Sequence, residues 1–428
     1  MKLRSLASGA FALILLATVG VNAGASPDAG GEVTAGKIPG GALWSAQVPP
    51  NWNGTLLLWS RGYAPHAGVP EAAPEKYRAM LLERGYAIAG SDYGSGGWAL
   101  AEAVPAQRAT LAAFRAKFGA PKRTIAWGAS MGGLVTTALA EQAEPQINGA
   151  LALCSSIGGA VGMMNMALDG GFVLRTLAAA DAGIELTGIT DDRGNAQRVG
   201  QAIKTAMQTP QGRARIALAG VLGGIPGWTR RDSAEPAASD AEAQVAEIAD
   251  AFVMGIMLPR QDQEARAGGG FSWNEGIDYR AQLAKSGRGA MVRALYAKAG
   301  VPLDADLARL AAAPRVRAAP GAIRYMMAHY TPDARPRVPL LAVQAIGDGA
   351  TSPSLQRAYA EAAAGTNLDA LYVRHTGHCT FSPEEVAAAL QRLERRLDSG
   401  HWPAVSAPFV AYTPPPMLRP CFSGGRCR

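Results

Sequence analysis

Serine, aspartate and histidine, the side chains that together make a hydroxyl group nucleophilic, each follow a short apolar run in this sequence. Ser130 stands in Gly128-Ala129-Ser130-Met131-Gly132, between the apolar run 123–127 and a second run with helical spacing. A Gly-x-Ser-x-Gly string alone is a weak signal, because 51 of the 428 residues are glycine. Its context of strand, tight turn and helix favours a nucleophile, so we expect Ser130 to attack a carbonyl carbon.

A serine nucleophile needs a base to accept its proton and an acid to orient that base. Only two of the five histidines, His375 and His378, directly follow the last apolar run. We predict that His378, in a glycine-containing loop, is the base and that His375 is structural. Asp348 stands between two glycines after the run 340–345 and either orients the histidine or caps a turn. The chain order Ser130, Asp348, His378 favours the catalytic interpretation.

Short apolar strands and amphipathic helices must position these residues, and they alternate along two parts of the chain. The predicted strands are 44–48, 55–60, 86–91, 123–127, 148–154, 338–345 and 368–374, and the predicted helices are 71–84, 105–118, 131–143, 354–364 and 383–397. Turn-forming residues at 49–54 predict a hairpin between the first two strands. The alternation predicts the α/β class, with a mostly parallel sheet and helices on both faces.

The alternation stops between residues 156 and 337, where the chain is mainly helical with Gly- and Pro-rich breaks. A structureless loop of that length is implausible, so we predict a helical cap at 156–337. The sheet domain is expected at 26–155 and 338–400, and an extended surface tail at 401–428. Six cap residues are candidates for an apolar pocket or for ordinary core: Met163, Met164, Met166, Trp228, Phe271 and Trp273.

Residues 1–25 are typical of a signal peptide, because Lys2 and Arg4 precede a short apolar run that small residues follow. We expect a periplasmic or secreted protein without a transmembrane anchor after cleavage. Cleavage lowers the formal net charge from +7 to +5, and the remaining Lys and Arg are scattered, which argues against nucleic-acid binding. No metal-ligand pattern and no cofactor motif is recognised, so neither is expected, and the oligomeric state is left open.

The four cysteines of an exported chain are candidates for disulfides. They are Cys154, Cys379, Cys421 and Cys427. Four cysteines allow three pairings, and their spacing does not choose among them.

Five stretches resemble, in order, those of secreted bacterial α/β-hydrolases with a large cap: NWNGTLLLWSRGY, GYAIAGSDYGSGGW, TIAWGASMGGL, IGDGATSP and GHCTFSPEE. The resemblance implies an α/β-hydrolase fold and an oxyanion hole formed by the backbone N–H groups of Tyr63 and Met131. The family often carries His-Gly before the first of these donors, whereas this chain has Arg61-Gly62.

A second resemblance concerns the cysteine that follows His378. Tannases and feruloyl esterases bridge such a cysteine to one directly before the serine, but here Ala129 occupies that position. Cys154 ends the next predicted strand, so the resemblance implies a Cys154–Cys379 bridge that ties the histidine loop to the sheet. Cys421 and Cys427 would then pair within the tail.

These observations predict an exported serine hydrolase that cleaves small-molecule carboxylic esters through an acyl-enzyme. One alternative is a serine aminopeptidase or amidase that uses the same triad. An aminopeptidase needs cap acids for the free amine of its substrate, and Glu275 and Asp278 are candidates. The other alternative is a non-catalytic binding protein of this fold.

Overall fold

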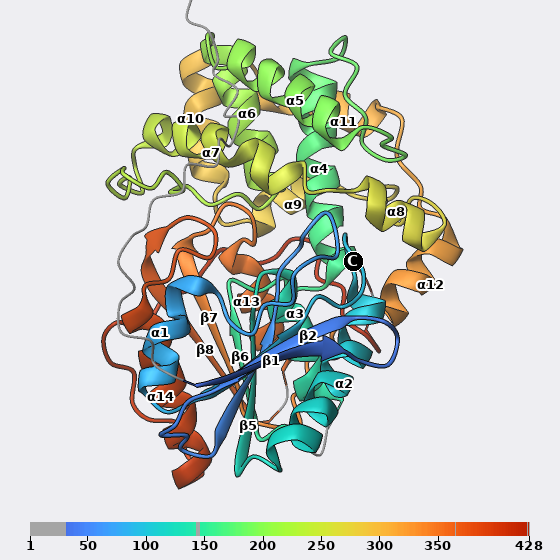
Figure 1. Cartoon of the computed structure of the whole chain (residues 1–428). Helices are drawn as coiled ribbons and strands as arrows, with labels where there is room; N and C mark the ends of the chain where they lie inside the picture. The colour runs from blue at the N-terminus through green and yellow to red at the C-terminus, as the bar shows by residue number, and fades with distance from the viewer. Residues whose placement is uncertain (1–30, 143–145, 364, 426, 428) are drawn as a thin grey trace, which may run out of the picture.

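The computed structural model describes residues 31–142, 146–363, 365–425 and 427 (Figure 1). The predicted signal peptide, residues 1–25, lies outside these described residues.

The described chain contains an eight-stranded sheet whose strand order is β1-β2-β4-β3-β5-β6-β7-β8. The strands are β1 (Glu32–Lys37), β2 (Leu43–Val48), β3 (Thr55–Ser60), β4 (Ala87–Ser91), β5 (Arg123–Ala129), β6 (Gly149–Leu153), β7 (Leu340–Gly347) and β8 (Leu368–Thr376). Only the pairs β1–β2 and β2–β4 are antiparallel, and all other pairs are parallel. The predicted mostly parallel α/β sheet is therefore confirmed.

The hairpin predicted between β2 and β3 is wrong. β2 pairs with β1 and β4, whereas β3 lies between β4 and β5. All six residues of β3 are buried, as expected for an inner strand that is covered on both faces. The turn formers at 49–54 therefore carry the chain past β4 and do not connect neighbouring strands. β1 was not predicted, because its mostly exposed residues lack an apolar run.

Helices cover both faces of the sheet because alternate strand residues point to opposite sides. Leu57 and Trp59 of β3 pack in the cluster that includes α1 (Glu75–Glu83) and α14 (Pro383–Ser399). Leu56 and Leu58 face the opposite cluster, and the helices on this side are α2 (Leu100–Phe118), α3 (Met131–Glu141) and α13 (Pro353–Ala362).

The helix predicted to open at Pro105 begins five residues earlier, at Leu100, with the proline inside it. Leu100, Ala103 and Val104 are buried, so their packing holds the first turn although Pro105 cannot donate a backbone hydrogen bond.

Nine helices lie between β6 and β7 and form a layer above the sheet (Figure 1). They are α4 (Ala160–Ala178), α5 (Asp192–Ala206), α6 (Pro210–Leu222), α7 (Ala241–Ile256), α8 (Gln261–Ala267), α9 (Tyr279–Lys285), α10 (Gly289–Ala299), α11 (Leu303–Ala312) and α12 (Pro320–Ala328). The central helix α4 is almost wholly buried and contacts α6, α7, α11 and α12. We call these nine helices and their connections the helical layer.

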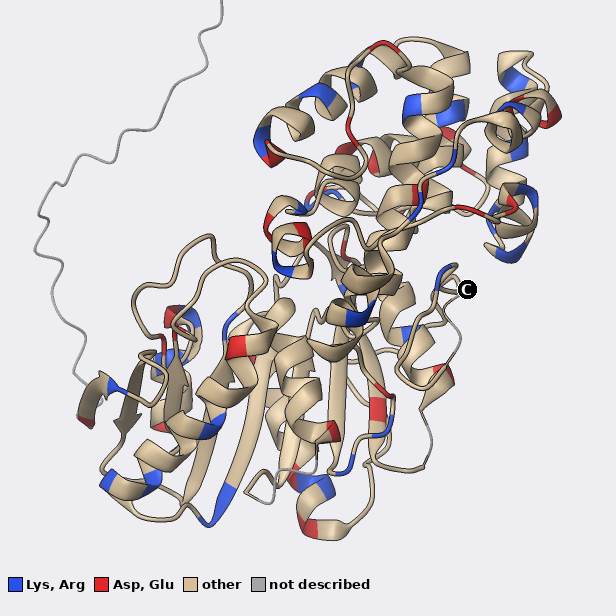
Figure 2. Ribbon diagram, turned by 90° about the vertical axis from the view of Figure 1, so that its right-hand side faces the viewer, with Lys and Arg blue, Asp and Glu red and all other residues tan. Residues whose placement is uncertain are grey.

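Basic and acidic residues are interspersed along both the sheet domain and the helical layer (Figure 2). Among the described residues, none of the helices combines the length and the apolar character that crossing a bilayer requires.

The C-terminal tail is extended, and a single bridge joins Val410 to Tyr372. The expectation that this tail lies on the surface does not hold for all of it, because residues 417–419 and Cys421 are buried. The guanidinium of Arg419 donates to Asp169 Oδ2 of α4 at 2.8 Å, and neither residue is more than 2% exposed. A buried ion pair thus fastens the tail to the central helix of the layer.

We expect Arg419→Met to lower the free energy of unfolding by about 1–3 kcal/mol at pH 7, because it leaves the buried Asp169 carboxyl group and the Trp273 carbonyl oxygen without their donor. Burial already raises the pKa of Asp169 to about 6, against the opposing effects of Arg419 and Tyr279. Without Arg419 this pKa rises further, so Asp169 takes up a proton and the deficit shrinks as the pH falls from 7 to 5.

Urea unfolding at both pH values measures this deficit. Arg317→Met is the matched control, since the Arg317 side chain is 79% exposed beside Glu275 and its loss should cost less than about 1 kcal/mol. A deficit equal in the two variants, or unchanged by pH, would contradict the assignment.

Candidate active site

Ser130 lies in the sharp turn between β5 and α3, with a backbone φ of 59° that residues with a side chain rarely adopt. A Cβ atom on Gly132 would lie 2.0 Å from the carbonyl oxygen of Ser60, and one on Gly128 would lie 2.4 Å from that of Gly132. Both glycines are therefore required, because β3, β5 and α3 approach so closely here. The turn presents the partly exposed Ser130 at the end of β5.

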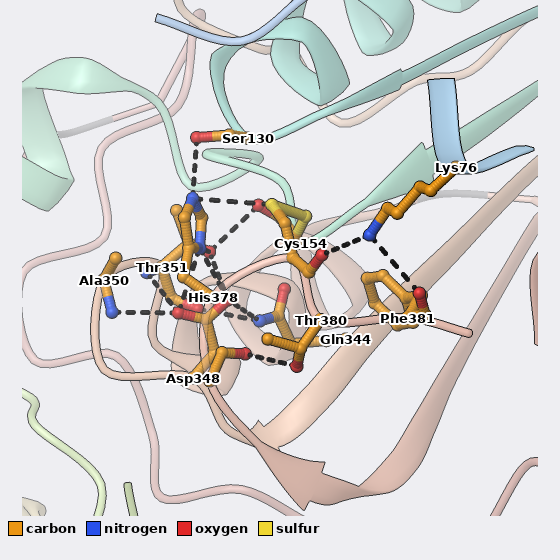
Figure 3. The surroundings of a disulfide bond; sticks show 12 residues. Lys76, Ser130, Cys154, Gln344, Asp348, Ala350, Thr351, His378, Thr380 and Phe381 are labelled. Carbon is orange, nitrogen blue, oxygen red and sulfur yellow. Dashed lines mark hydrogen bonds and ion pairs between the residues drawn. A yellow bond between two sulfur atoms is a disulfide. The ribbon is translucent and has the colours of Figure 1, made fainter. Parts of the chain in front are cut away.

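The structure brings together the three residues predicted from their order in the sequence (Figure 3). His378 Nε2 lies 2.9 Å from Ser130 Oγ, and His378 Nδ1 lies 2.9 Å from Asp348 Oδ2. Since the ionised carboxylate only accepts hydrogen bonds, we place the ring proton on Nδ1. Nε2 then carries a lone pair directed at the serine hydroxyl, which is the arrangement that general-base catalysis requires.

Asp348 is completely buried and its orientation is fixed by a set of donors. Oδ1 accepts hydrogen bonds from the amides of Ala350 and Thr351 at 2.8 and 3.0 Å. Oδ2 accepts one from Gln344 Nε2 at 2.9 Å, and the Thr351 hydroxyl lies at the same distance. Sequence reasoning missed Gln344 and Thr351. Both residues are close to Asp348 in the sequence, which was the one sign of their role. Proximity in the sequence does not show which side chains point toward the carboxylate.

Two opposing effects act on the pKa of His378. Burial lowers its pKa, but the charge of Asp348 and the hydrogen bond to it outweigh burial and leave the pKa above the ordinary value.

His375, the histidine that we expected to be structural, points elsewhere. Its Nε2 lies 3.3 Å from Glu385 Oε2 at the start of α14. The hydrogen bond to Glu385 is the main cause that raises the pKa of His375.

A disulfide joins Cys154, which follows β6, to Cys379, the neighbour of His378. A second disulfide joins Cys421 to Cys427 in the tail. Cys154, His378 and Cys379 are close enough to suggest a metal site, but sulfurs bonded to each other offer no thiolate.

The histidine loop is also held from outside the sheet. Lys76 Nζ of α1 donates to the carbonyl oxygen of Cys379 at 3.3 Å, and Tyr77 donates to that of Phe381 at 2.9 Å. The loop is thus fastened on two sides, by a disulfide to β6 and by hydrogen bonds to α1 (Figure 3).

The oxyanion hole was expected from two backbone amides, those of Met131 and Tyr63. Met131 is the first residue of α3, so no carbonyl of its own helix accepts its amide hydrogen. Tyr63 follows Gly62, where an added Cβ would lie 4.0 Å from Ser130 Oγ. Both segments therefore lie near Ser130 Oγ, as an oxyanion hole formed by their amides would require.

Arg61, which departs from the histidine usual in the hydrolases that the sequence resembles, anchors the loop that leads to Tyr63. Its buried guanidinium donates to the carbonyl oxygens of Ser95, Asp92 and Gly62 at 2.5, 2.7 and 3.0 Å. It also lies 4.5 Å from the centre of the Tyr93 ring, whose hydroxyl donates to the Arg61 carbonyl oxygen at 3.0 Å. Arginine therefore positions the loop through carbonyl groups that histidine has too few donors to satisfy.

The six residues considered for an apolar pocket have different surroundings in the structure. Met163, Met164, Met166 and Phe271 are buried, and Met163 and Met166 also line a small cavity beside Gly349 and Ala350. Trp228 lines a cavity, and Trp273 lies beneath the Arg419 guanidinium.

The two acids considered for binding a substrate amine are both occupied. Glu275 Oε1 accepts a hydrogen bond from Arg317 at 2.8 Å, and Asp278 Oδ1 accepts one from the amide of Arg280 at the start of α9.

Comparison with solved structures finds similarity to hydrolases. An esterase from Aspergillus oryzae is similar with a TM-score of 0.45 and 11% identity over 87% of this chain and 81% of that chain. A proline iminopeptidase of Mycobacterium smegmatis is similar with a TM-score of 0.40 and 15% identity over 86% of this chain and all of that one.

No protein-family model matches the chain. Among known proteins, the o-phthalyl amidase of Xanthobacter agilis is 31% identical over an aligned length of 409 residues, and the match covers 86% of this chain and 88% of that enzyme. With the strand order of the sheet and the sharp turn at Ser130 after β5, this similarity shows that the chain is an α/β-hydrolase and belongs to the same family as o-phthalyl amidase.

Proposed function

We propose that this hydrolase cleaves small carboxylic esters and amides through a covalent acyl-enzyme on Ser130. The observation that carries the proposal is the continuous hydrogen-bonded series from Ser130 Oγ through His378 to the buried Asp348. A binding protein of this fold has no need of a base at hydrogen-bond distance from a strained serine.

The reaction follows from the positions of these atoms. Ser130 Oγ attacks the substrate carbonyl carbon while His378 Nε2 takes its proton, and the amides of Tyr63 and Met131 stabilise the oxyanion. His378 then gives the proton to the leaving alcohol or amine, which departs and leaves Ser130 acylated. Water, deprotonated by the same nitrogen, releases the carboxylic acid and restores the serine.

Ester cleavage is the activity that the sequence predicts, and amide cleavage is the second candidate, favoured by the relative that is named an amidase. Both bonds pass through the same acyl-enzyme, but an amine leaves only after His378 has protonated it. The relative's name points to an o-phthalyl acyl group, so we propose that amides of aromatic carboxylic acids are substrates. Aminopeptidase activity is less well supported, since both acids considered for its amine have other partners.

We also propose that the protein acts in the periplasm or outside the cell. The sequence of residues 1–25 supports export, and so do the two disulfides.

A fluorophosphonate is expected to add one covalent group to the wild-type protein and none to Ser130→Ala, because Oγ is the nucleophile. Intact-mass spectrometry measures the adduct. Turnover of a p-nitrophenyl ester, an amide of o-phthalic acid and an aminoacyl nitroanilide is compared in parallel. We expect turnover of the first two and little of the third. Labelling that persists in Ser130→Ala would overturn the assignment of the nucleophile.

The pH profile of kcat/KM should decline on the acid side with a midpoint above 6.5, since catalysis needs neutral His378 and Asp348 raises its pKa. Activity is therefore lost as the pH falls through that raised value. Asp348→Asn removes the carboxylate charge, so the midpoint should move to lower pH and kcat should fall by about 10⁴-fold. His375→Asn is the control, with kcat and midpoint retained, and an equal loss of kcat there would show that the wrong histidine was chosen.

Replacing both Cys154 and Cys379 by alanine should lower kcat even under conditions in which the double variant is still folded, because Cys379 is the residue next to His378. The loss of a native disulfide commonly costs about 2–5 kcal/mol. The tail pair, Cys421→Ala with Cys427→Ala, is the matched control and should leave kcat unchanged. Kinetics and thermal melting of both double variants are measured, with non-reducing peptide mapping of the parent. Unchanged kcat in the first double variant would show that the bridge does not position the histidine.

A further inference from the structure

A cavity of about 300 Å³ lies where the helical layer, β7 and the tail meet, apart from the candidate active site. None of the three triad residues lines it, although Ile346 and residues 352–354, on either side of Asp348 in the sequence, do so. Its volume is at the lower end of the range for small-molecule sites. Much of its wall is apolar and includes Val221, Ile225, Pro226, Trp228, Pro415 and Leu418.

One cation in this cavity has no anionic partner among the described residues. Arg288, the residue before α10, is partly buried, and its guanidinium donates to the carbonyl oxygen of Ile225 at 2.5 Å. Its other polar neighbour is the Met291 sulfur, at 3.9 Å. The carboxylate that also lines the cavity, Glu235, is already paired with Arg374 at 2.5 Å. Among the described residues, Arg288 therefore has no ion-pair partner of its own.

The environment of Arg288 disfavours that charge. Burial lowers the pKa of Arg288 to about 10, and the facing Tyr412 only partly opposes this effect. The Arg288 guanidinium stays protonated at neutral pH, so the protein keeps a cation in surroundings that favour the neutral form. An anion placed beside the guanidinium would relieve this cost, and a carboxylate matches its two parallel N–H groups.

The remaining lining supplies both polar and apolar groups. Ser286 and Gln244 line the cavity together with Arg288, and Ser352 is the N-cap residue of α13. Trp228 and Tyr412 supply aromatic surface. Such a site suits a ligand with one carboxylate and a compact apolar body.

We propose that this cavity is a second binding site, which takes a small organic carboxylate whose charged group pairs with Arg288 and whose apolar body packs against Trp228 and Tyr412. The site is separate from Ser130 and does not rest on the proposed catalytic function. Because the cavity is lined by residues on both sides of Asp348 in the sequence, a bound carboxylate lies beside the loop that holds the triad acid.

Benzoate is the probe, and isothermal titration calorimetry on the full chain is the measurement. We expect benzoate to bind with 1:1 stoichiometry and Arg288→Met to weaken binding by at least tenfold. Arg293→Met, at an exposed arginine of α10, is the control and should bind benzoate as the parent does. Benzyl alcohol, which lacks the charge, should bind at least tenfold more weakly than benzoate.

Ala238→Phe provides an independent test, because Ala238 lines the cavity at an exposed position. The larger side chain should fill part of the cavity while Arg288 and its charge are retained. It should also weaken benzoate binding at least tenfold, with an unchanged melting temperature. Should Arg288→Met fail to fold, Ala238→Phe and benzyl alcohol decide the question. Undetectable binding to the parent, or equal affinity for benzoate in parent and Ala238→Phe, would overturn the proposal.

Discussion

The close contact between Gly132 of α3 and the carbonyl oxygen of Ser60 sets the geometry of the whole candidate site. Ser60 ends β3, and the chain continues directly into Arg61, Gly62 and Tyr63. The same contact therefore fixes the start of the helix behind Ser130 and the start of the loop opposite it. The amide of Ser130 also donates to the Leu153 carbonyl oxygen at 3.1 Å, so three neighbouring strands define the position of one hydroxyl.

Several parts of this arrangement could be predicted from sequence, because inner parallel strands are short apolar runs bounded by turn formers. Ser130, Asp348 and His378 each follow such a run, and a parallel sheet brings the ends of its strands to one edge. Strand pairing was harder to predict. A turn-rich segment between two strands indicates a hairpin unless a third strand occupies the space between them, and the residues of 49–54 carry no sign of β4.

Long-range polar contacts were the other features that the sequence did not reveal. Arg419 stands in a tail rich in proline, and its partner Asp169 lies 250 residues earlier in a helix that reads as apolar. Arg61 was recognised only as a departure from a histidine, whereas its three carbonyl acceptors show how the loop is held. A buried charged side chain whose hydrogen bonds go to backbone carbonyl groups has no sequence signature, because every residue has a carbonyl group.

The Cys154–Cys379 bond also changes the connectivity of the molecule, since it closes a covalent ring that includes the entire helical layer, β7 and β8. A protease that cut one exposed connection of the layer would open the ring without releasing a fragment. The piece that bears Ser130 and the piece that bears His378 would stay joined through the two sulfurs. Their mutual effective concentration would then be that of linked chains and would not fall on dilution. Ser130 and His378 are 248 residues apart in the sequence, and this bond makes their pairing independent of an intact backbone in the layer above them.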